Sequence, residues 1–133
     1  MDSSPAGFAV AEMRDRFNVF VYGTLRRGQA ANDRLAGAEY VGDAHVTGIL
    51  YNIDDKFPAL VLYVGAARVD GEIWRCPIDM LSELDTYEGV SDGLFRRVGV
   101  QAKRNDTIED VPAWTYVAGP LLSQKLTPER RIN

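Results

Sequence analysis

The hydrophobic positions of the chain fall into short runs separated by turn-forming residues, a pattern typical of β-strands. The run at residues 17–22, FNVFVY, is apolar or aromatic at nearly every position, which predicts a central strand buried on both faces. Four further runs are bounded by Gly, Pro, Asp or Asn, and two more close the pattern. These six predicted strands cover residues 39–44, 46–53, 59–64, 69–76, 95–103 and 111–117.

One segment has helical spacing instead. Residues 78–88 follow Pro77, which suits the first turn of a helix, and they precede Gly89, a common stop signal. The apolar side chains of this segment share one arc of a helical wheel: Ile78, Met80, Leu81 and Leu84. Many strands with one clear helix predict an α+β domain built on a curled sheet or a small barrel.

The length of 133 residues, with 46% hydrophobic and 26% charged residues, predicts one folded domain that needs no disulfide or metal. Residues 1–16 mix Ser, Pro, Gly and charges, which is typical of a flexible N-terminal tail. We therefore expect a domain over residues 17–121 and a polar C-terminal tail over residues 122–133.

Charge and cysteine content exclude several classes of protein. The net charge of −4 argues against a nucleic-acid partner, because such proteins carry a basic surplus that neutralises phosphates. The single cysteine, Cys76, cannot form a disulfide within the chain and fits a reducing compartment. No apolar run is long enough for a secretory signal or a membrane span, so we expect a soluble cytoplasmic protein. The sequence predicts no oligomeric state.

Glu88 falls inside the apolar arc of the predicted helix. A carboxylate facing a core is disfavoured in its charged form, so its pKa would rise and it would become a proton acceptor near neutral pH. Two other interpretations remain open. Glu88 could lie in a frayed last turn, where the wheel no longer applies, or it could pair with Arg96 or Arg97.

The loop after the first strand combines YGTL (residues 22–25) with RRG (residues 26–28). Glycine in such a loop lets backbone N–H groups converge on an anion. A P-loop would continue with Lys and Ser or Thr, but Gln29 and Ala30 stand there, which argues against nucleotide hydrolysis. The alternative is a tight turn with a solvated basic pair.

Six motifs, in order over roughly residues 17–118, resemble the gamma-glutamylcyclotransferase-like family, especially its gamma-glutamylamine cyclotransferase branch. The motifs are FVYGTLRRGQ (20–29), FPALV (57–61), VDGEIW (69–74), LDTYEGV (84–90), GLFRRVGV (93–100) and AWTYV (113–117). The resemblance implies a small mixed β-barrel of about six to seven strands, with one or two helices packed outside and a cavity at one mouth.

The resemblance also implies an activity. In this family the α-amino group of a gamma-glutamyl amine or peptide attacks its own side-chain carbonyl, which gives 5-oxoproline and a free amine. The family's catalytic glutamate falls on Glu88, and its substrate-holding loop falls on Tyr22, Gly23, Thr24 and Leu25. That loop would hold either the substrate carboxylate or the developing oxyanion, and the sequence leaves both roles open.

Tyr22 and Tyr116 are candidates for hydroxyl groups in the pocket, with barrel-lining aromatics as the alternative for each. Many family members have Tyr where this chain has Phe95, so any contact made by that hydroxyl is absent and substrate preference would change. Arg26 would add positive field at the mouth or simply be solvated. Trp74 and Trp114 are expected to serve packing.

Other mechanisms find little support in the sequence. His45 is the only histidine, and no nucleophile elbow accompanies it. Nothing marks Cys76 as a reactive thiol. No cluster of residues has metal-ligand spacing, so we expect neither a metal nor a cofactor. Two alternatives to the cyclotransferase remain: a non-catalytic small-molecule binding module on the same fold, and a different acyl-transfer enzyme that uses the same cavity.

Overall fold

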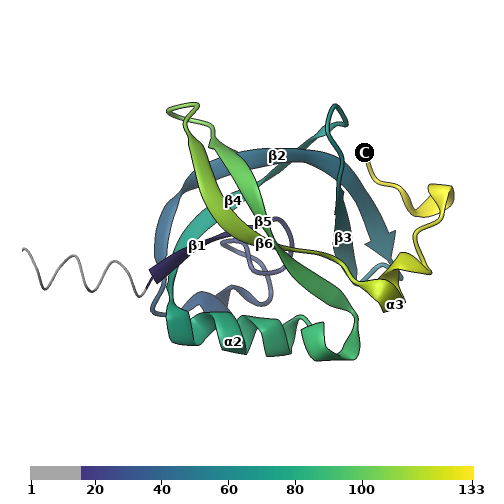
Figure 1. Ribbon diagram of the computed structural model, residues 1–133, viewed down its shortest axis with the longest axis horizontal. Coiled ribbons are helices and arrows are strands. Elements are labelled where there is room, and N and C mark those ends of the chain that lie inside the picture. Colours follow the sequence, from purple (N-terminus) through teal and green to yellow (C-terminus); the bar gives the residue numbers. More distant parts are fainter. Residues whose placement is uncertain (1–15) are drawn as a thin grey trace, which may run out of the picture.

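The computed structural model describes residues 16–133 (Figure 1). Residues 1–15 of the expected N-terminal tail, 1–16, lie outside the described residues, and Arg16 is the first residue of β1. The elements follow in the order β1 (Arg16–Val21), η1 (Asn32–Leu35), β2 (Glu39–Ile53), β3 (Phe57–Leu62), β4 (Arg68–Pro77), α2 (Ile78–Tyr87), η2 (Val90–Asp92), β5 (Phe95–Arg104), β6 (Asp110–Ala118), α3 (Pro120–Ser123) and η3 (Pro128–Arg130).

The strands form a small mixed barrel, as the resemblance implied. Their order is β3-β2-β4-β1-β6-β5, and a further pairing of β2 with β5 closes five of them into a barrel with β3 as an added strand. All of these pairings are antiparallel except β1 with β6, which run parallel. Figure 1 shows the curved strands enclosing the core, with α2 lying along the outside of the barrel.

β1 is the central buried strand that its composition predicts. Val19, Phe20 and Val21 are at most 3% exposed. Val19 and Val21 pack into one hydrophobic cluster and Phe20 into the other, because successive side chains of a strand point to opposite faces. The strand lies next to Gly71 of β4, where a Cβ atom would come within 2.3 Å of the Val21 carbonyl oxygen. Glycine at that position therefore allows β4 to approach β1 closely.

The two strands expected at residues 39–44 and 46–53 are one continuous strand, β2. The prediction of two separate strands was wrong, because the backbone of His45 between them pairs with Asp70 on one side and Lys103 on the other. What changes near the middle of β2 is the partner strand: residues 39–47 pair with β4 and residues 48–53 with β3. A register shift between Tyr40 and Gly42 adds to the curvature of the barrel.

α2 begins after Pro77 and ends at Tyr87, one residue earlier than predicted. Pro77 belongs to the end of β4 and precedes the helix rather than entering its first turn. The helix packs on the barrel through Met80, Leu81 and Leu84, whereas Ile78, expected in the same arc, is 50% exposed at the first turn.

Glu88 follows α2 with helical backbone angles, φ −80° and ψ −1°, and its N–H donates to the Leu84 carbonyl at 2.8 Å. Gly89 then adopts φ 65°, a left-handed conformation that ends the helix as the sequence predicts. The wheel therefore still applies at Glu88, and the frayed-end alternative does not describe this residue.

Residues 122–133, expected as a C-terminal tail, lie against the barrel. Leu122 is buried, and the Ile132 N–H donates to the Leu50 carbonyl at 2.8 Å. The backbone of Arg131 forms an isolated antiparallel β-bridge with that of Tyr51. Between residues 16 and 133, no helix combines the length and apolar character required to cross a membrane.

Candidate active site

A cavity of about 260 Å³ lies between the loop after β1, the start of β3, the end of α2 and strands β5 and β6. Its walls are largely apolar, and among the described residues that line it Glu88 is the one carboxylate. All of the residues proposed from the sequence for catalysis or substrate binding line this cavity: Tyr22, Gly23, Thr24, Leu25, Glu88 and Tyr116. Segments more than ninety residues apart in the chain thus converge on one small space.

Burial raises the pKa of the Glu88 carboxyl group to about 7. Desolvation causes this shift, because an apolar cavity disfavours the charged form of a carboxyl group. Among residues 16–133, Glu88 forms no ion pair that would offset that effect. Arg97, one of the two suggested partners, donates to Asp85 instead, with Nε 2.8 Å from Oδ1. Arg96, the other, lies exposed on β5.

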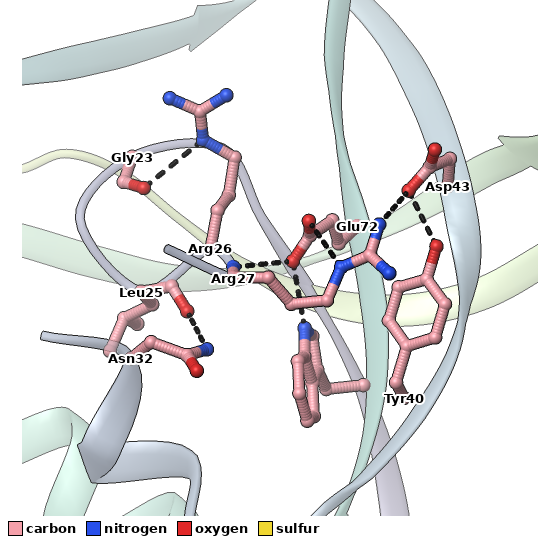
Figure 2. Close-up of polar contacts among 9 residues, drawn as sticks. Gly23, Leu25, Arg26, Arg27, Asn32, Tyr40, Asp43 and Glu72 are labelled. Carbon is pink, nitrogen blue, oxygen red and sulfur yellow. Dashed lines mark hydrogen bonds and ion pairs between the residues drawn. The ribbon is translucent and has the colours of Figure 1, made fainter. Parts of the chain in front are cut away.

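In the loop after β1, the backbone carbonyl groups accept hydrogen bonds from residues that follow them in the chain. The Gly23 carbonyl accepts from both the backbone N–H and the Nε of Arg26, each at 3.1 Å. The Thr24 carbonyl accepts from the Ala31 N–H at 2.9 Å, and the Leu25 carbonyl accepts from Asn32 Nδ2 at 2.7 Å (Figure 2). Three successive carbonyl groups are therefore occupied inside the loop.

The N–H groups of Thr24 and Leu25 make no hydrogen bond to any other residue of the described range 16–133. In a trans peptide the N–H points away from the preceding carbonyl, so these two N–H groups face away from the donors that bind Gly23 and Thr24. Unused backbone donors beside a cavity are suited to an anionic group. The Nε of Arg26, in turn, donates to the Gly23 carbonyl within the loop.

The hydroxyl groups of Tyr22 and Tyr116 both form hydrogen bonds within the protein. Tyr22 donates to the Tyr116 carbonyl at 2.6 Å and accepts from the Leu60 N–H at 3.2 Å, which ties β1 to β6 and β3. The Tyr116 hydroxyl donates to Asp85 Oδ1 at 2.6 Å. Burial, and to a smaller extent the charge of Glu88, raises the pKa of Tyr22 well above its usual range. The Tyr22 hydroxyl therefore keeps its proton.

The remaining wall is shaped by Phe95, which is buried and lies with its ring centroid 5.7 Å from that of Phe57. Phe95, at the position for which the family resemblance suggested Tyr, thus packs against a second aromatic ring. Lys56, before β3, is the one cation among the cavity-lining residues of the range 16–133.

The side chains that were not expected to take part in catalysis lie outside the cavity. His45 Nδ1 is 2.8 Å from Asn105 Oδ1, and His45 does not line the cavity. Cys76 is fully buried, and burial raises the pKa of its thiol to about 12, so it stays a neutral thiol. No group of three or more His, Cys, Asp or Glu residues in the part of the chain that the structure describes could hold a metal ion.

Three residues near the site were missed from the sequence. Tyr87 lines the cavity, and its hydroxyl lies 3.1 Å from the Thr24 hydroxyl. Asp85 holds α2 to β5 and β6 through Arg97 and Tyr116. Glu72 of β4, only 8% exposed, binds the loop after β1. The sequence feature that could have pointed to Glu72 is a charged residue within the predicted strand VDGEIW.

Comparison with known proteins identifies relatives for nearly the whole described chain. Residues 19–132 match the family model described as Gamma-glutamyl cyclotransferase, AIG2-like. Gamma-glutamylaminecyclotransferase A of Danio rerio is 36% identical over 95 residues, which cover 65% of this chain and 58% of that relative. The match thus spans less than two thirds of the relative's own length.

Two further comparisons extend over more of each molecule. The Drosophila melanogaster protein CG2811 is 30% identical, with 92% of this chain and 88% of the relative covered. The crystal structure of an AIG2-like protein from Mus musculus superimposes with a TM-score of 0.70 at 22% identity, covering 86% of this chain and 82% of that one. At that identity, the structural likeness shows a shared fold.

Proposed function

The chain belongs to the gamma-glutamyl cyclotransferase, AIG2-like family, and on that premise we propose that it is a gamma-glutamylcyclotransferase that releases 5-oxoproline and a free amine from a gamma-glutamyl amine or peptide. One observation carries the proposal. Glu88, whose pKa is raised to about 7 by burial, lines the same cavity as the loop at Tyr22, Gly23, Thr24 and Leu25. The proposed reaction requires a proton carrier and anion-binding groups of this kind.

Folding of the substrate supplies the nucleophile. The α-amino nitrogen attacks the side-chain carbonyl carbon of the same molecule, so the enzyme needs neither a nucleophilic side chain nor a cofactor. A cavity of about 260 Å³ favours a compact, folded substrate over an extended one. Holding the amine against the carbonyl gives a high effective concentration.

Glu88 moves the proton. In its ionised form it accepts a proton from the substrate α-ammonium group, which frees the nitrogen lone pair for attack. Ring closure leaves two protons on the attacking nitrogen. As the bond between the carbonyl carbon and the leaving nitrogen breaks, Glu88 returns its proton to the leaving nitrogen, and the surplus proton of the ring nitrogen passes to the released amine, which leaves as an ammonium group. A pKa of about 7 suits both steps, because the two protonation states have similar free energies near neutral pH.

The loop after β1 binds negative charge. The unused N–H groups of Thr24 and Leu25 would donate either to the oxyanion that forms on attack or to the substrate carboxylate. Thr24 also carries a hydroxyl group at the cavity wall. Tyr22 and Tyr116 contribute shape to the pocket, since their hydroxyl protons are donated within the protein.

The setting that we infer is a reducing, cytoplasmic one, which fits the single buried thiol of Cys76. A second candidate function is a non-catalytic binding module for the same class of small molecule. The position of Glu88 favours catalysis, because a module that only binds has no use for a desolvated carboxylate in an apolar cavity.

The proposal is tested by incubating the purified protein with a panel of gamma-glutamyl amines and gamma-glutamyl dipeptides while 5-oxoproline is quantified. We expect at least one member of the panel to give 5-oxoproline and an equal amount of free amine. The matched control is Glu88→Gln, which keeps the shape of the side chain and removes the base. Binding of panel members without product would favour the binding module instead.

A further inference from the structure

Glu72 of β4 contacts the loop after β1 through Arg27. It has no role in the reaction proposed above. It is 8% exposed, on a strand whose neighbouring residues Gly71 and Ile73 are buried as well. A charged side chain in such a place requires partners, because an unpaired buried charge is strongly disfavoured. The partners of Glu72 come from the loop itself.

The Glu72 carboxylate accepts three hydrogen bonds. Oε1 accepts from the backbone N–H of Arg27 at 3.0 Å and from Trp74 Nε1 at 3.1 Å, and Oε2 accepts from Arg27 Nε at 3.1 Å. Arg27 is thus bound through its backbone and its side chain to the same carboxylate (Figure 2). Hydrogen bonds to a charged acceptor are stronger than those between neutral groups.

The outer side of Arg27 is bound more loosely. Its Nη2 lies 3.1 Å from Asp43 Oδ1, and its guanidinium carbon lies 3.9 Å from the centroid of the Tyr40 ring. The Asp43 side chain is 56% exposed, so solvent screens that ion pair. Glu72, whose side chain is only 10% exposed, is the partner that fixes Arg27 in place.

Fixing Arg27 fixes the residues before it. Arg26, its neighbour, donates through N–H and Nε to the Gly23 carbonyl, which sets the peptide unit that carries the Thr24 N–H. The internal hydrogen bonds of the loop, such as that from the Ala31 N–H to the Thr24 carbonyl, join loop residues to one another, whereas Glu72 anchors the loop to β4. The position of the loop relative to the barrel therefore depends in part on these side-chain contacts.

We propose that Glu72 is a positioning residue of the site: through Arg27 it holds the loop after β1 so that the N–H groups of Thr24 and Leu25 stay directed to the ligand. The inference rests on the proposed function, since it assigns a role in the same reaction. Glu72 does not line the cavity and acts only through the loop.

The test compares Glu72→Gln with Asp43→Asn. Glu72→Gln keeps the length of the side chain, but it removes the charge and places an NH₂ group where one of the two acceptor oxygens faces a donor. Asp43→Asn alters the exposed partner of the same guanidinium and is the matched control. For Glu72→Gln we expect kcat/KM for 5-oxoproline formation, per folded molecule, to fall about tenfold or more, and for Asp43→Asn to stay within about threefold.

Two further measurements separate positioning from other roles. Amide hydrogen exchange of the peptide covering residues 23–31 should accelerate about fivefold or more in Glu72→Gln, while residues 95–118 exchange as in the wild type. The pH dependence of kcat/KM should keep its rise near pH 7, because Glu88 is untouched. Loop exchange equal to that of the wild type, or kcat/KM within about threefold of it, would overturn the proposal.

The outcomes also distinguish this inference from the proposed function. A wild-type protein that converts no member of the substrate panel defeats the proposed function, and hydrogen exchange then decides alone whether Glu72 holds the loop. If Glu72→Gln fails to fold, Arg27→Ala replaces it, since that side chain is 51% exposed. Faster loop exchange in Arg27→Ala is the expected result, and unchanged exchange would overturn the proposal.

Discussion

The hydroxyl group of Thr24 lies 3.1 Å from that of Tyr87, the residue that immediately precedes Glu88. The contact joins the loop after β1 directly to the end of α2, so the two halves of the site are linked within one cavity wall. Arg34 of η1 stacks on the Tyr87 ring, 4.1 Å from its centroid, and supports it from a second element. The distance between the anion-binding loop and the proton carrier is therefore fixed by a side-chain pair as well as by the barrel.

Tyr87→Phe tests this link, because it keeps the ring and its cation–π contact and removes only the hydroxyl group. We expect kcat/KM to fall by roughly three- to tenfold as the loop loosens, and the free energy of unfolding to fall by about 0.5–1.5 kcal/mol. Thr24→Ser, which keeps a hydroxyl, is the control and should retain most activity. Wild-type kcat/KM in Tyr87→Phe would show that the hydroxyl pair has no role in the site.

Asp85 holds α2 to the barrel, so its replacement should lower the free energy of unfolding. It accepts from Arg97 Nε at 2.8 Å and from the Tyr116 hydroxyl at 2.6 Å. We expect Asp85→Asn to lower the free energy of unfolding by about 1–3 kcal/mol, measured by denaturant titration.

Tyr116→Phe removes one of the same hydrogen bonds, so the two changes should not be additive. The double variant should be less destabilised than the sum of the single variants by about 0.5 kcal/mol or more. Strict additivity would contradict the assigned contact between Asp85 and Tyr116.

Tyr22→Phe should act mainly on the barrel. The variant removes the acceptor of the Leu60 N–H, which lies at a residue with no solvent exposure, and the donor to the Tyr116 carbonyl. A buried donor without a partner costs about 1–3 kcal/mol, so we expect a loss of stability in that range by thermal or chemical denaturation. Because the pKa of Tyr22 is raised far above neutrality, the pH profile of activity should not change. A shifted profile would assign the hydroxyl a role in proton transfer.

Glu88 should make stability depend on pH in a defined direction. Its pKa is about 7 in the folded protein and about 4.3 in an unfolded chain. Below about pH 4 both states are protonated, so Glu88 has no net effect. As pH rises toward 7 the unfolded state loses this proton more readily, and the wild type loses stability relative to Glu88→Gln.

The difference should level off above pH 7, where Glu88→Gln is expected to be more stable by an amount on the order of 3–4 kcal/mol. The measurement is denaturant unfolding of both proteins at pH 4.5 and pH 8. If the difference in stability between the two proteins were the same at pH 4.5 and at pH 8, the carboxyl group would not be desolvated in the folded protein.

Most of the fold could be predicted from local patterns. Alternating and apolar runs bounded by turn residues located the strands, and the buried β1 followed from the composition of residues 17–22. The helical wheel placed Glu88 in line with the packed face of the predicted helix, and the family resemblance supplied the barrel. The continuity of β2 could not be read in the same way, because the change of partner from β4 to β3 is decided by pairing rather than by composition.

The candidate site was only partly predictable, for a similar reason. Glu88 and the YGTL loop are marked by motifs, but the contacts that fix them are long-range. Glu72 meets Arg27 across 45 residues of sequence, and Thr24 meets Tyr87 across 63. Apart from the glutamate within the strand motif VDGEIW, nothing local distinguishes these side chains from ordinary polar residues. The hydroxyl of Tyr22 likewise found its partners only in the folded barrel.

Whether Glu88 carries the proton can be decided by the pH dependence of kcat/KM for 5-oxoproline formation in the wild type and in Glu88→Gln. We expect the wild-type rate to rise about tenfold per pH unit below an inflection near pH 7. In Glu88→Gln we expect a loss of about 10²- to 10⁴-fold, without that inflection. A variant that keeps wild-type activity, or the same inflection, would contradict the assignment of Glu88.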